Sequence, residues 1–284
     1  MSRLRIIHDT TYRYRIPVKF GPHRIVLRPR EGHDVRLERM DLAVSPAHEV
    51  FWSRDLFGNT IGTLTFPEPA DILHIQSDVL IVRSEHKKVD LDSLPKQEYP
   101  IAYDALEQGI AEAYQQFSFV ADAPAVREWV TGALQIHQEG DAQVALERLN
   151  REIFEHYEYR RRDEKGVQTP AETLSLRTGS CRDKATLFME AARALGMAAR
   201  FASGYLDCAA SQAGRASTHA WAEVYLPDCG WIGFDPTIGE TTSRKHTVVG
   251  VSHHPRGVMP ISGQFDGSRS DYIGLEVQVK IQAL

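Results

Sequence analysis

Cys181 is the residue of this sequence with the clearest potential for covalent chemistry. It follows Thr178-Gly-Ser, a turn-forming segment, and opens a stretch whose apolar residues recur at helical spacing. We therefore predict a helix from Cys181 to Leu195, ended by Gly196. Unpaired N–H groups and the helix dipole stabilise a thiolate at such a position, and the thiolate is the nucleophilic form. Because most free cysteines are merely small buried hydrophobic residues, the hypothesis also requires a base.

His219 is the candidate base, on a predicted strand that reaches Leu226. Strict alternation places His219, Trp221, Glu223 and Tyr225 on one face and small or apolar residues on the other. A turn at Asp228-Cys-Gly then leads into a second strand, which a hairpin would fold back beside the first. Asp235 ends that second strand and could reach the imidazole. Cysteine, histidine and aspartate are the nucleophile, the general base and acid, and the orienting group that thiol acyl chemistry requires.

Four ordered motifs carry a resemblance to a known family. They are Gly179-x-Cys181-x-Asp183-x-Ala185, Ala199-Arg200-x-x-x-Gly204-Tyr205, His219-Ala-Trp221-x-Glu223-Val and Gly230-Trp231-x-x-x-Asp235-Pro236-Thr237. Over about residues 155–240 the chain resembles the core of the transglutaminase-like superfamily. Upstream, Tyr157-Glu-Tyr159 and Thr169-Pro-Ala171 resemble the segment before the cysteine in the bacterial members. The resemblance implies a papain-like α+β core with Cys181 as nucleophile, His219 as base and Asp235 as third member.

Three functions fit these residues. Attack of Cys181 on a protein or peptide carboxamide would give a thioester, and an amine acceptor would then make the protein a transglutaminase-like acyltransferase. With water as the acceptor, the same triad would make a cysteine peptidase or amidase. The third hypothesis is a catalytically silent peptide-binding module, against which the intact Cys181, His219 and Asp235 count. The sequence does not separate transfer from hydrolysis.

Three further residues are candidates for the surroundings of the site. The N–H of Cys181 is the natural first donor to an oxyanion, and Tyr159 is a candidate second donor or, equally, a structural tyrosine. Trp221 and Trp231 flank the histidine on its strands. They could shield the His–Asp pair from water, line an acyl channel, or pack in the core.

Residues 1–85 alternate like strands and are interrupted by turn residues such as Gly21-Pro22 and Gly58-Asn59. We predict an all-β, sandwich-like N-terminal domain. The segment Asp55-Leu-Phe57-Gly58-Asn59 also resembles the β domain at the N-terminus of bacterial transglutaminase-like proteins. The domain would be a structural lobe that shields the core, a wall of the substrate cleft or a docking module for a partner.

The remaining chain is predicted to be one catalytic domain behind a linker. Residues 86–100, with His-Lys-Lys, acids and prolines, indicate the linker. The catalytic domain, 101–284, comprises a helical segment (101–155), the core (155–240), and a loop and final strand (241–284). Polar loops at 160–166 and 207–217 are candidate substrate-selecting elements.

Composition excludes several classes of function. A net charge of −5 and a pI near 6.2 argue against a surface for nucleic acid or anionic membranes. The sequence has no run of about twenty apolar residues and no secretory stretch, so we predict a cytoplasmic location. Cys181, Cys208 and Cys229 form no disulfide framework or zinc motif, and paired His253-His254 indicates surface histidines. The proposed chemistry needs no metal or cofactor, its partner is a protein or peptide substrate, and the oligomeric state is not readable.

Overall fold

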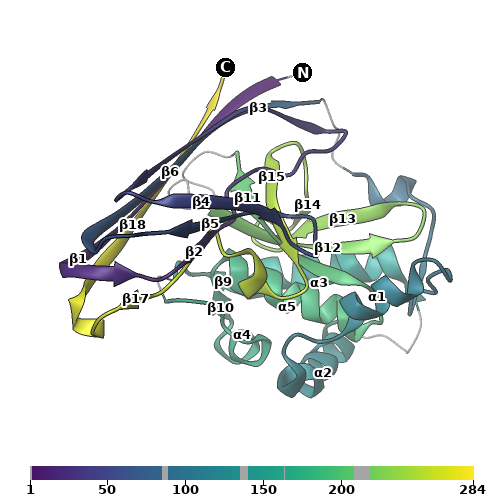
Figure 1. The fold of residues 1–284 in the computed structure, drawn as a ribbon. Coiled ribbons are helices and arrows are strands. Elements are labelled where there is room, and N and C mark those ends of the chain that lie inside the picture. Colours follow the sequence, from purple (N-terminus) through teal and green to yellow (C-terminus); the bar gives the residue numbers. More distant parts are fainter. Residues whose placement is uncertain (1, 85–88, 135–139, 163, 208–217) are drawn as a thin grey trace.

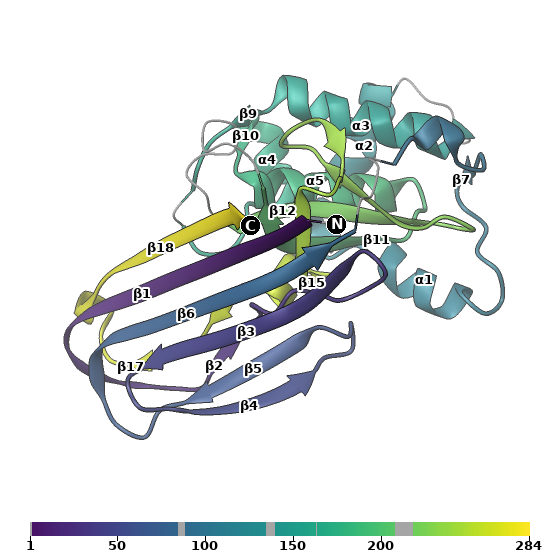
Figure 2. The same ribbon diagram turned by 90° about the horizontal axis from the view of Figure 1, so that it is seen from above.

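The computed structural model describes residues 2–84, 89–134, 140–162, 164–207 and 218–284. Its N-terminal part consists of two antiparallel sheets, made from β1 (Ser2–Phe20), β2 (His23–Ile25), β3 (Val35–Ser45), β4 (Glu49–Arg54), β5 (Thr60–Thr65) and β6 (Ala70–Arg83). Buried and exposed residues alternate along β1 and β6, as expected for strands with one face in a core. Apolar residues of both sheets, including Tyr14, Ile25, Leu64 and Leu73, share one hydrophobic cluster. The predicted β sandwich is therefore observed (Figures 1 and 2).

The end of the chain belongs to this sandwich. Strand β18 (Tyr272–Ala283) pairs with β1, and the short β16 (Ile261–Ser262) and β17 (Phe265–Asp266) pair with β2 and β1. The sheet orders are β17-β1-β6-β3, with β18 also on β1, and β16-β2-β5-β4. Figure 2 shows the two chain ends side by side. The final strand was predicted correctly as a strand, but its assignment to the catalytic domain was wrong, because alternation does not identify a distant pairing partner.

The second part is a mixed α/β unit around a five-stranded antiparallel sheet in the order β14-β13-β12-β11-β15. Its strands are β11 (Ala199–Leu206), β12 (Thr218–Leu226), β13 (Gly230–Asp235), β14 (Glu240–Thr241) and β15 (His246–Ser252). Its helices are α1 (Gln108–Gln115), α2 (Ala123–Leu134), α3 (Ala142–His156), α4 (Pro170–Leu176) and α5 (Cys181–Ala194). Two two-stranded ladders complete it: β7 (Glu98–Tyr99) with β8 (Gly140–Asp141), and β9 (Glu158–Tyr159) with β10 (Thr178–Gly179).

Helix α5 is the central helix of this part and is almost entirely buried. Its apolar residues pack with one face of β12, whose inward residues are Ala220, Ala222, Val224 and Leu226. Stacking of Phe188 on Phe234, with ring centroids 5.2 Å apart, fixes the helix against β13. The helix begins at Cys181, as predicted, so its packing determines where the thiol lies.

The predicted linker is not a free connection over its described part. Leu91 and Tyr99 are 4% and 2% exposed and belong to the cluster around α5. The sequence does not indicate that Leu91 and Tyr99 are buried, because each is a single apolar residue among charged residues and prolines.

The two parts of the molecule share a packed and hydrogen-bonded interface. Tyr205 of β11 packs among residues of β1 and β6, and its hydroxyl is 3.0 Å from Nδ1 of the buried His8. Asn59, fully buried, donates to the carbonyl oxygen of Val251 and accepts from its N–H. The N-terminal part is thus held in a defined position against the sheet that carries the candidate site. No helix among the described residues is long and apolar enough to cross a membrane.

Candidate active site

The thiol of Cys181 lies on the first turn of α5, directly after the β9–β10 ladder. Parallel pairing places Gly179 opposite Tyr159, so the two segments arrive together at the helix start. A Cβ at Gly179 would lie 2.8 Å from the Cβ of Asp183, which explains why a glycine occupies this position. The Cys181 side chain is half-buried and therefore remains reachable from solvent.

Asp183 fixes the turn that presents the thiol. Its carboxylate accepts hydrogen bonds from the N–H and hydroxyl of Ser180, at 2.8 and 2.7 Å. It also accepts from the N–H of Gln168 and the guanidinium of Arg162, at 2.7 and 2.9 Å. Because Asp183 is fully buried, all four donors serve to hold one backbone geometry. The negative charge at the helix start is also favoured by the dipole.

His219 and Asp235 form a buried pair. Nε2 of His219 is 2.6 Å from Oδ2 of Asp235, and the two side chains are 5% and 0% exposed. Strands β12 and β13 are neighbours, and their pairing brings the beginning of one close to the end of the other. The hairpin predicted from the sequence is therefore the element that joins these residues.

Cys181 lies close enough to the imidazole of His219 to contribute to the raised pKa of that ring. Since Nε2 faces Asp235, the other ring nitrogen is the one left for the sulfur. Burial, the largest single influence, lowers the pKa of His219, but the charge and hydrogen bond of Asp235 and the contacts with Cys181 outweigh it. The pKa is raised well above 6.5 as a result, so the site favours a protonated imidazole beside the sulfur.

A second histidine, His246 of β15, contacts the same carboxylate. Its Nε2 is 3.1 Å from Oδ2 of Asp235, and its ring packs edge-on against Trp221 with centroids 5.1 Å apart. The N–H of Ser243 donates to its Nδ1 over 3.1 Å, so that nitrogen carries no proton. His246 therefore presents an Nε2–H donor to Asp235.

Asp235 is surrounded by donors. Besides the two imidazoles on Oδ2, the N–H of Thr237 donates to Oδ1 at 2.9 Å. Burial by itself raises the pKa of this carboxyl, but the charge of His219 and the hydrogen bonds from both histidines lower it far below 3.8. Asp235 is thus kept ionised although fully buried, which allows it to orient and stabilise a protonated His219.

These three side chains are also the described residues that could hold a metal ion. One ligand atom from each of His219, Asp235 and His246 lies within 4.8 Å of the others. An ion bound there would displace the Nε2 proton of His246, which the Ser243 contact fixes, and would separate both histidines from Asp235. The hydrogen bonding therefore fits an orienting network better than a metal centre.

Tyr159, the candidate second donor, lies opposite Gly179 in the β9–β10 ladder, two residues before the thiol. It is 37% exposed, and its pKa is raised first by burial and then by the nearby charge of Cys181, while Arg161 and Arg182 act in the opposite direction. A partly exposed tyrosine in this position can contact a substrate. Its role as an oxyanion donor remains a prediction.

The two predicted tryptophans occupy different places. Trp221 is 1% exposed and contacts the rings of His219 and His246, so it shields the pair but cannot line an open channel. Trp231 pairs with Tyr225, six residues along β12 from His219, which corresponds to about 20 Å. It stacks instead on the guanidinium of Arg200, 3.8 Å from the ring centroid. Trp231 is therefore removed from the predicted site, because alternation identifies a strand face but not a position along the strand.

Cys229 and the paired histidines lie apart from this network. Cys229 is in the hairpin turn between β12 and β13, and Cys208 and the loop 208–217 fall outside the described residues. His253 and His254 stack on Phe57 and Phe119 and are not among the residues that surround Asp235. His246 was missed by sequence reasoning. Its only signal is a polar residue that opens an otherwise apolar strand, His246-Thr-Val-Val-Gly-Val.

Comparison with known families finds two matches. Residues 4–82 match the bacterial transglutaminase-like N-terminal region, and residues 132–236 match the transglutaminase-like superfamily. The second range contains Cys181, His219 and Asp235.

Relatives and solved structures cover nearly the whole chain. An uncharacterised protein of Mycobacterium tuberculosis is 29% identical over 98% of this chain and 92% of its own length. One of Mycobacterium leprae is 23% identical over 98% of this chain and 99% of its own length. The crystal structure of a candidate cysteine protease from Cytophaga hutchinsonii has a TM-score of 0.74 at 16% identity, covering 99% of this chain and 90% of that one. The likeness in fold thus includes the β sandwich as well as the catalytic part.

Proposed function

Because the chain belongs to the transglutaminase-like superfamily, a family of thiol-dependent enzymes, we propose that it transfers acyl groups from protein or peptide carboxamides through a Cys181 thioester. The single observation that carries the proposal is the buried His219–Asp235 pair, 2.6 Å apart, whose imidazole lies close enough to Cys181 for the thiol to influence its pKa. The membership and the α+β fold agree with what the motifs predicted from sequence.

In the first half-reaction the Cys181 thiolate attacks the carboxamide carbon. Electrons of the C=O bond move to oxygen, which gives a tetrahedral oxyanion. Protonated His219 then donates its proton to the leaving nitrogen, the C–N bond breaks, and ammonia departs. The raised pKa of His219 supports this role, since a protonated imidazole is available as the acid.

The oxyanion needs fixed donors during this step. The N–H of Cys181 is at the first position of α5, where the helix supplies no acceptor, and it is free to serve. One such donor typically contributes about 10²–10³ in rate. Tyr159, which pairs with Gly179 just before the helix and is partly exposed, is the proposed second donor.

In the second half-reaction a primary amine attacks the thioester. Neutral His219 accepts a proton from the amine, the C–S bond breaks, and an isopeptide product leaves with the thiolate regenerated. Asp235 does not change protonation state. It stabilises the imidazolium and fixes the ring, helped by its donors His246 and Thr237.

The test is a product analysis with a glutamine-containing peptide, with and without a labelled primary amine. Transfer predicts incorporation of the amine with loss of ammonia, and Cys181→Ala and His219→Gln should abolish it. A peptidase or amidase would release the hydrolysed acid or cleaved peptide at a rate independent of the amine. No reaction over a broad peptide panel would refute both enzymes and leave the binding module.

A further inference from the structure

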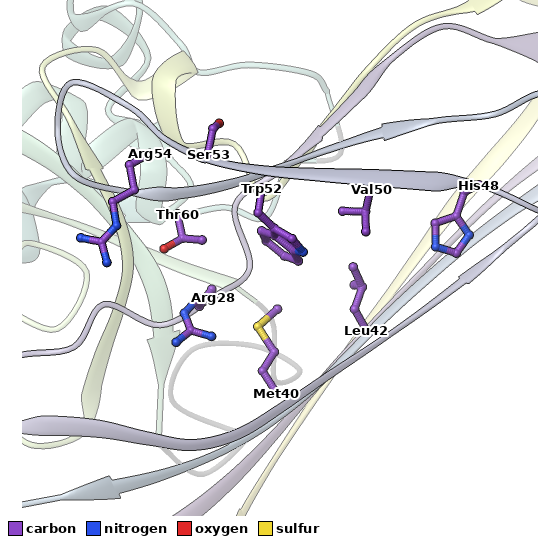
Figure 3. Close-up of a pocket in the computed structure, with 9 residues that line it drawn as sticks. All are labelled: Arg28, Met40, Leu42, His48, Val50, Trp52, Ser53, Arg54 and Thr60. Carbon is purple, nitrogen blue, oxygen red and sulfur yellow. The ribbon is translucent and has the colours of Figure 1, made fainter.

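A cleft of about 600 Å³ opens in the N-terminal sandwich, away from the candidate active site. Met40 and Leu42 of β3 form one wall, and Val50 and Trp52 of β4 form the other. Figure 3 shows these four side chains facing each other across the cleft. The cleft exists because β3 and β4 are the last strands of their sheets and the sandwich is not closed between them.

The middle of the β4 wall, between the charged Glu49 and Arg54 at its two ends, lacks the protection usual for an edge strand. All six residues of β4 are exposed, and Val50, Phe51 and Trp52 keep 39%, 69% and 40% of their surface. Within the described part of the chain, no strand pairs with its outer edge. Free backbone N–H and C=O groups beside an apolar surface are a template for adding another strand, and natural edges are normally blunted by charge, proline or a cover.

The lining of the cleft carries cationic and no acidic side chains although the chain is negative overall. Of the nine described residues that line it, Arg28 and Arg54 are cationic and none is acidic, whereas the whole chain has a net charge of −5. Arg28 and Arg54 lie together at one end and His48 at the other (Figure 3). Arg54 forms no ion pair with any described residue, and Arg28 pairs only with the half-exposed Glu31.

We propose that this cleft binds an extended segment of a partner polypeptide, added as a strand to the outer edge of β4. Antiparallel addition would place the start of the segment at Arg54. The matching pattern is an acidic residue followed by two apolar residues at alternate positions, opposite Arg54, Trp52 and Val50 respectively. Six residues of β4 span about 20 Å, enough for one such segment.

The free edge favours a polypeptide over other occupants. A small amphiphilic anion would satisfy the apolar walls and the arginines but would leave the backbone groups of β4 unpaired. A second copy of this chain would place its own β4 there, and symmetric antiparallel pairing about Phe51 would set His48 opposite Arg54 of the other copy, two residues without charge complementarity. An extended acidic segment would pair with the free edge of β4, contact the apolar walls and place its carboxylate near the arginines.

The test uses the full chain and a fluorescent peptide, acetyl-Thr-Glu-Thr-Val-Thr-Leu-Thr-amide, followed by anisotropy. We expect saturable binding that weakens with added salt. Glutamine in place of the peptide's glutamate should weaken it about fivefold, the upper end for one exposed ion pair. A peptide methylated on alternate backbone nitrogens should not bind, because it cannot pair with the edge.

Protein variants locate the site. Arg54→Gln should weaken binding about fivefold, and Trp52→Ala about tenfold or more, as for a central aromatic contact. Arg13→Gln, an exposed arginine of β1 outside the cleft, is the matched control and should leave the affinity unchanged. Thermal unfolding of Trp52→Ala shows whether the sandwich is intact, and Arg54→Gln tests the site without altering packing.

Four results would overturn the proposal. Equal affinity of the methylated and parent peptides, or of Arg54→Gln and the unaltered chain, would exclude strand addition at this site. Binding of dodecanoate but not of the peptide would assign the cleft to a small amphiphile. Concentration-dependent dimerisation that Trp52→Ala abolishes, without peptide binding, would assign the edge to a second copy.

Discussion

Replacing His246 tests whether the second imidazole is needed to keep Asp235 ionised. The residue is 8% exposed, donates through Nε2 to Oδ2 of Asp235 over 3.1 Å, and packs against Trp221. His246→Phe removes the donor and retains a ring of similar size, whereas His246→Gln retains an N–H donor. Comparing the two separates the hydrogen bond from the packing.

The magnitude follows from the charge of the acceptor. A hydrogen bond to an ionised group contributes about 1.5–3 kcal/mol, and one pKa unit corresponds to about 1.36 kcal/mol. Loss of the donor should therefore raise the pKa of Asp235 by about one to two units from its strongly lowered value. The stability that Asp235 provides is present above the unfolded pKa of about 3.9 and is lost as pH falls through the folded pKa. In His246→Phe this loss begins at higher pH.

The assay is the pH profile of kcat/KM together with urea unfolding at several pH values. We expect the acid-induced loss of stability of His246→Phe to begin about one to two pH units higher, with stability at pH 7 lower by about 1.5–3 kcal/mol and a lower kcat/KM. His246→Gln should restore most of the lost stability and activity. The same stability at each pH in the unaltered enzyme and His246→Phe, or equal losses in the Phe and Gln variants, would refute the orienting role.

Three other outcomes are expected. Iodoacetamide should label Cys181 much faster than Cys229 at pH 6–7, because burial and then a nearby carboxylate raise the pKa of Cys229. Peptide mapping measures the two labelling rates, and equal rates would contradict an activated thiol at Cys181. Asp235→Asn should move the alkaline limb of kcat/KM to lower pH, since the raised pKa of His219 depends on that charge; an unmoved limb would contradict it. Asn59→Ala should destabilise the chain by about 2–4 kcal/mol in urea unfolding, because it leaves buried backbone groups of β15 unpaired; a loss below about 0.5 kcal/mol would not fit.

Local patterns predicted the elements of the site well. Helical spacing after Gly179 located α5 and its first residue, and the alternation around His219 with the following turn located the β12–β13 hairpin. A helix and a hairpin are formed by residues close together in the sequence, so a local pattern is enough to predict them. The family motifs named Cys181, His219 and Asp235, and the structure pairs His219 with Asp235, while the catalytic roles of the three stay a prediction.

Features that depend on non-local pairing were not predicted. His246 reaches Asp235 although β15 pairs with β11, two strands away from β13 in the sheet, and no short-range feature of the sequence predicts that order. The same holds for β18, whose alternation is clear but whose partner, β1, is at the other end of the chain. Trp231 shares a strand face with the site residues, yet its place near Arg200 depends on distance along the strand.

The central claim is that Cys181 carries the acyl group, and intact-mass spectrometry of the enzyme mixed with a glutamine-containing peptide and quenched in acid tests it most directly. The account predicts a protein mass increased by that of the peptide less ammonia, mapped to Cys181, absent in Cys181→Ala and lost on addition of a primary amine. An unmodified protein during observed turnover, or the same adduct in Cys181→Ala, would contradict it.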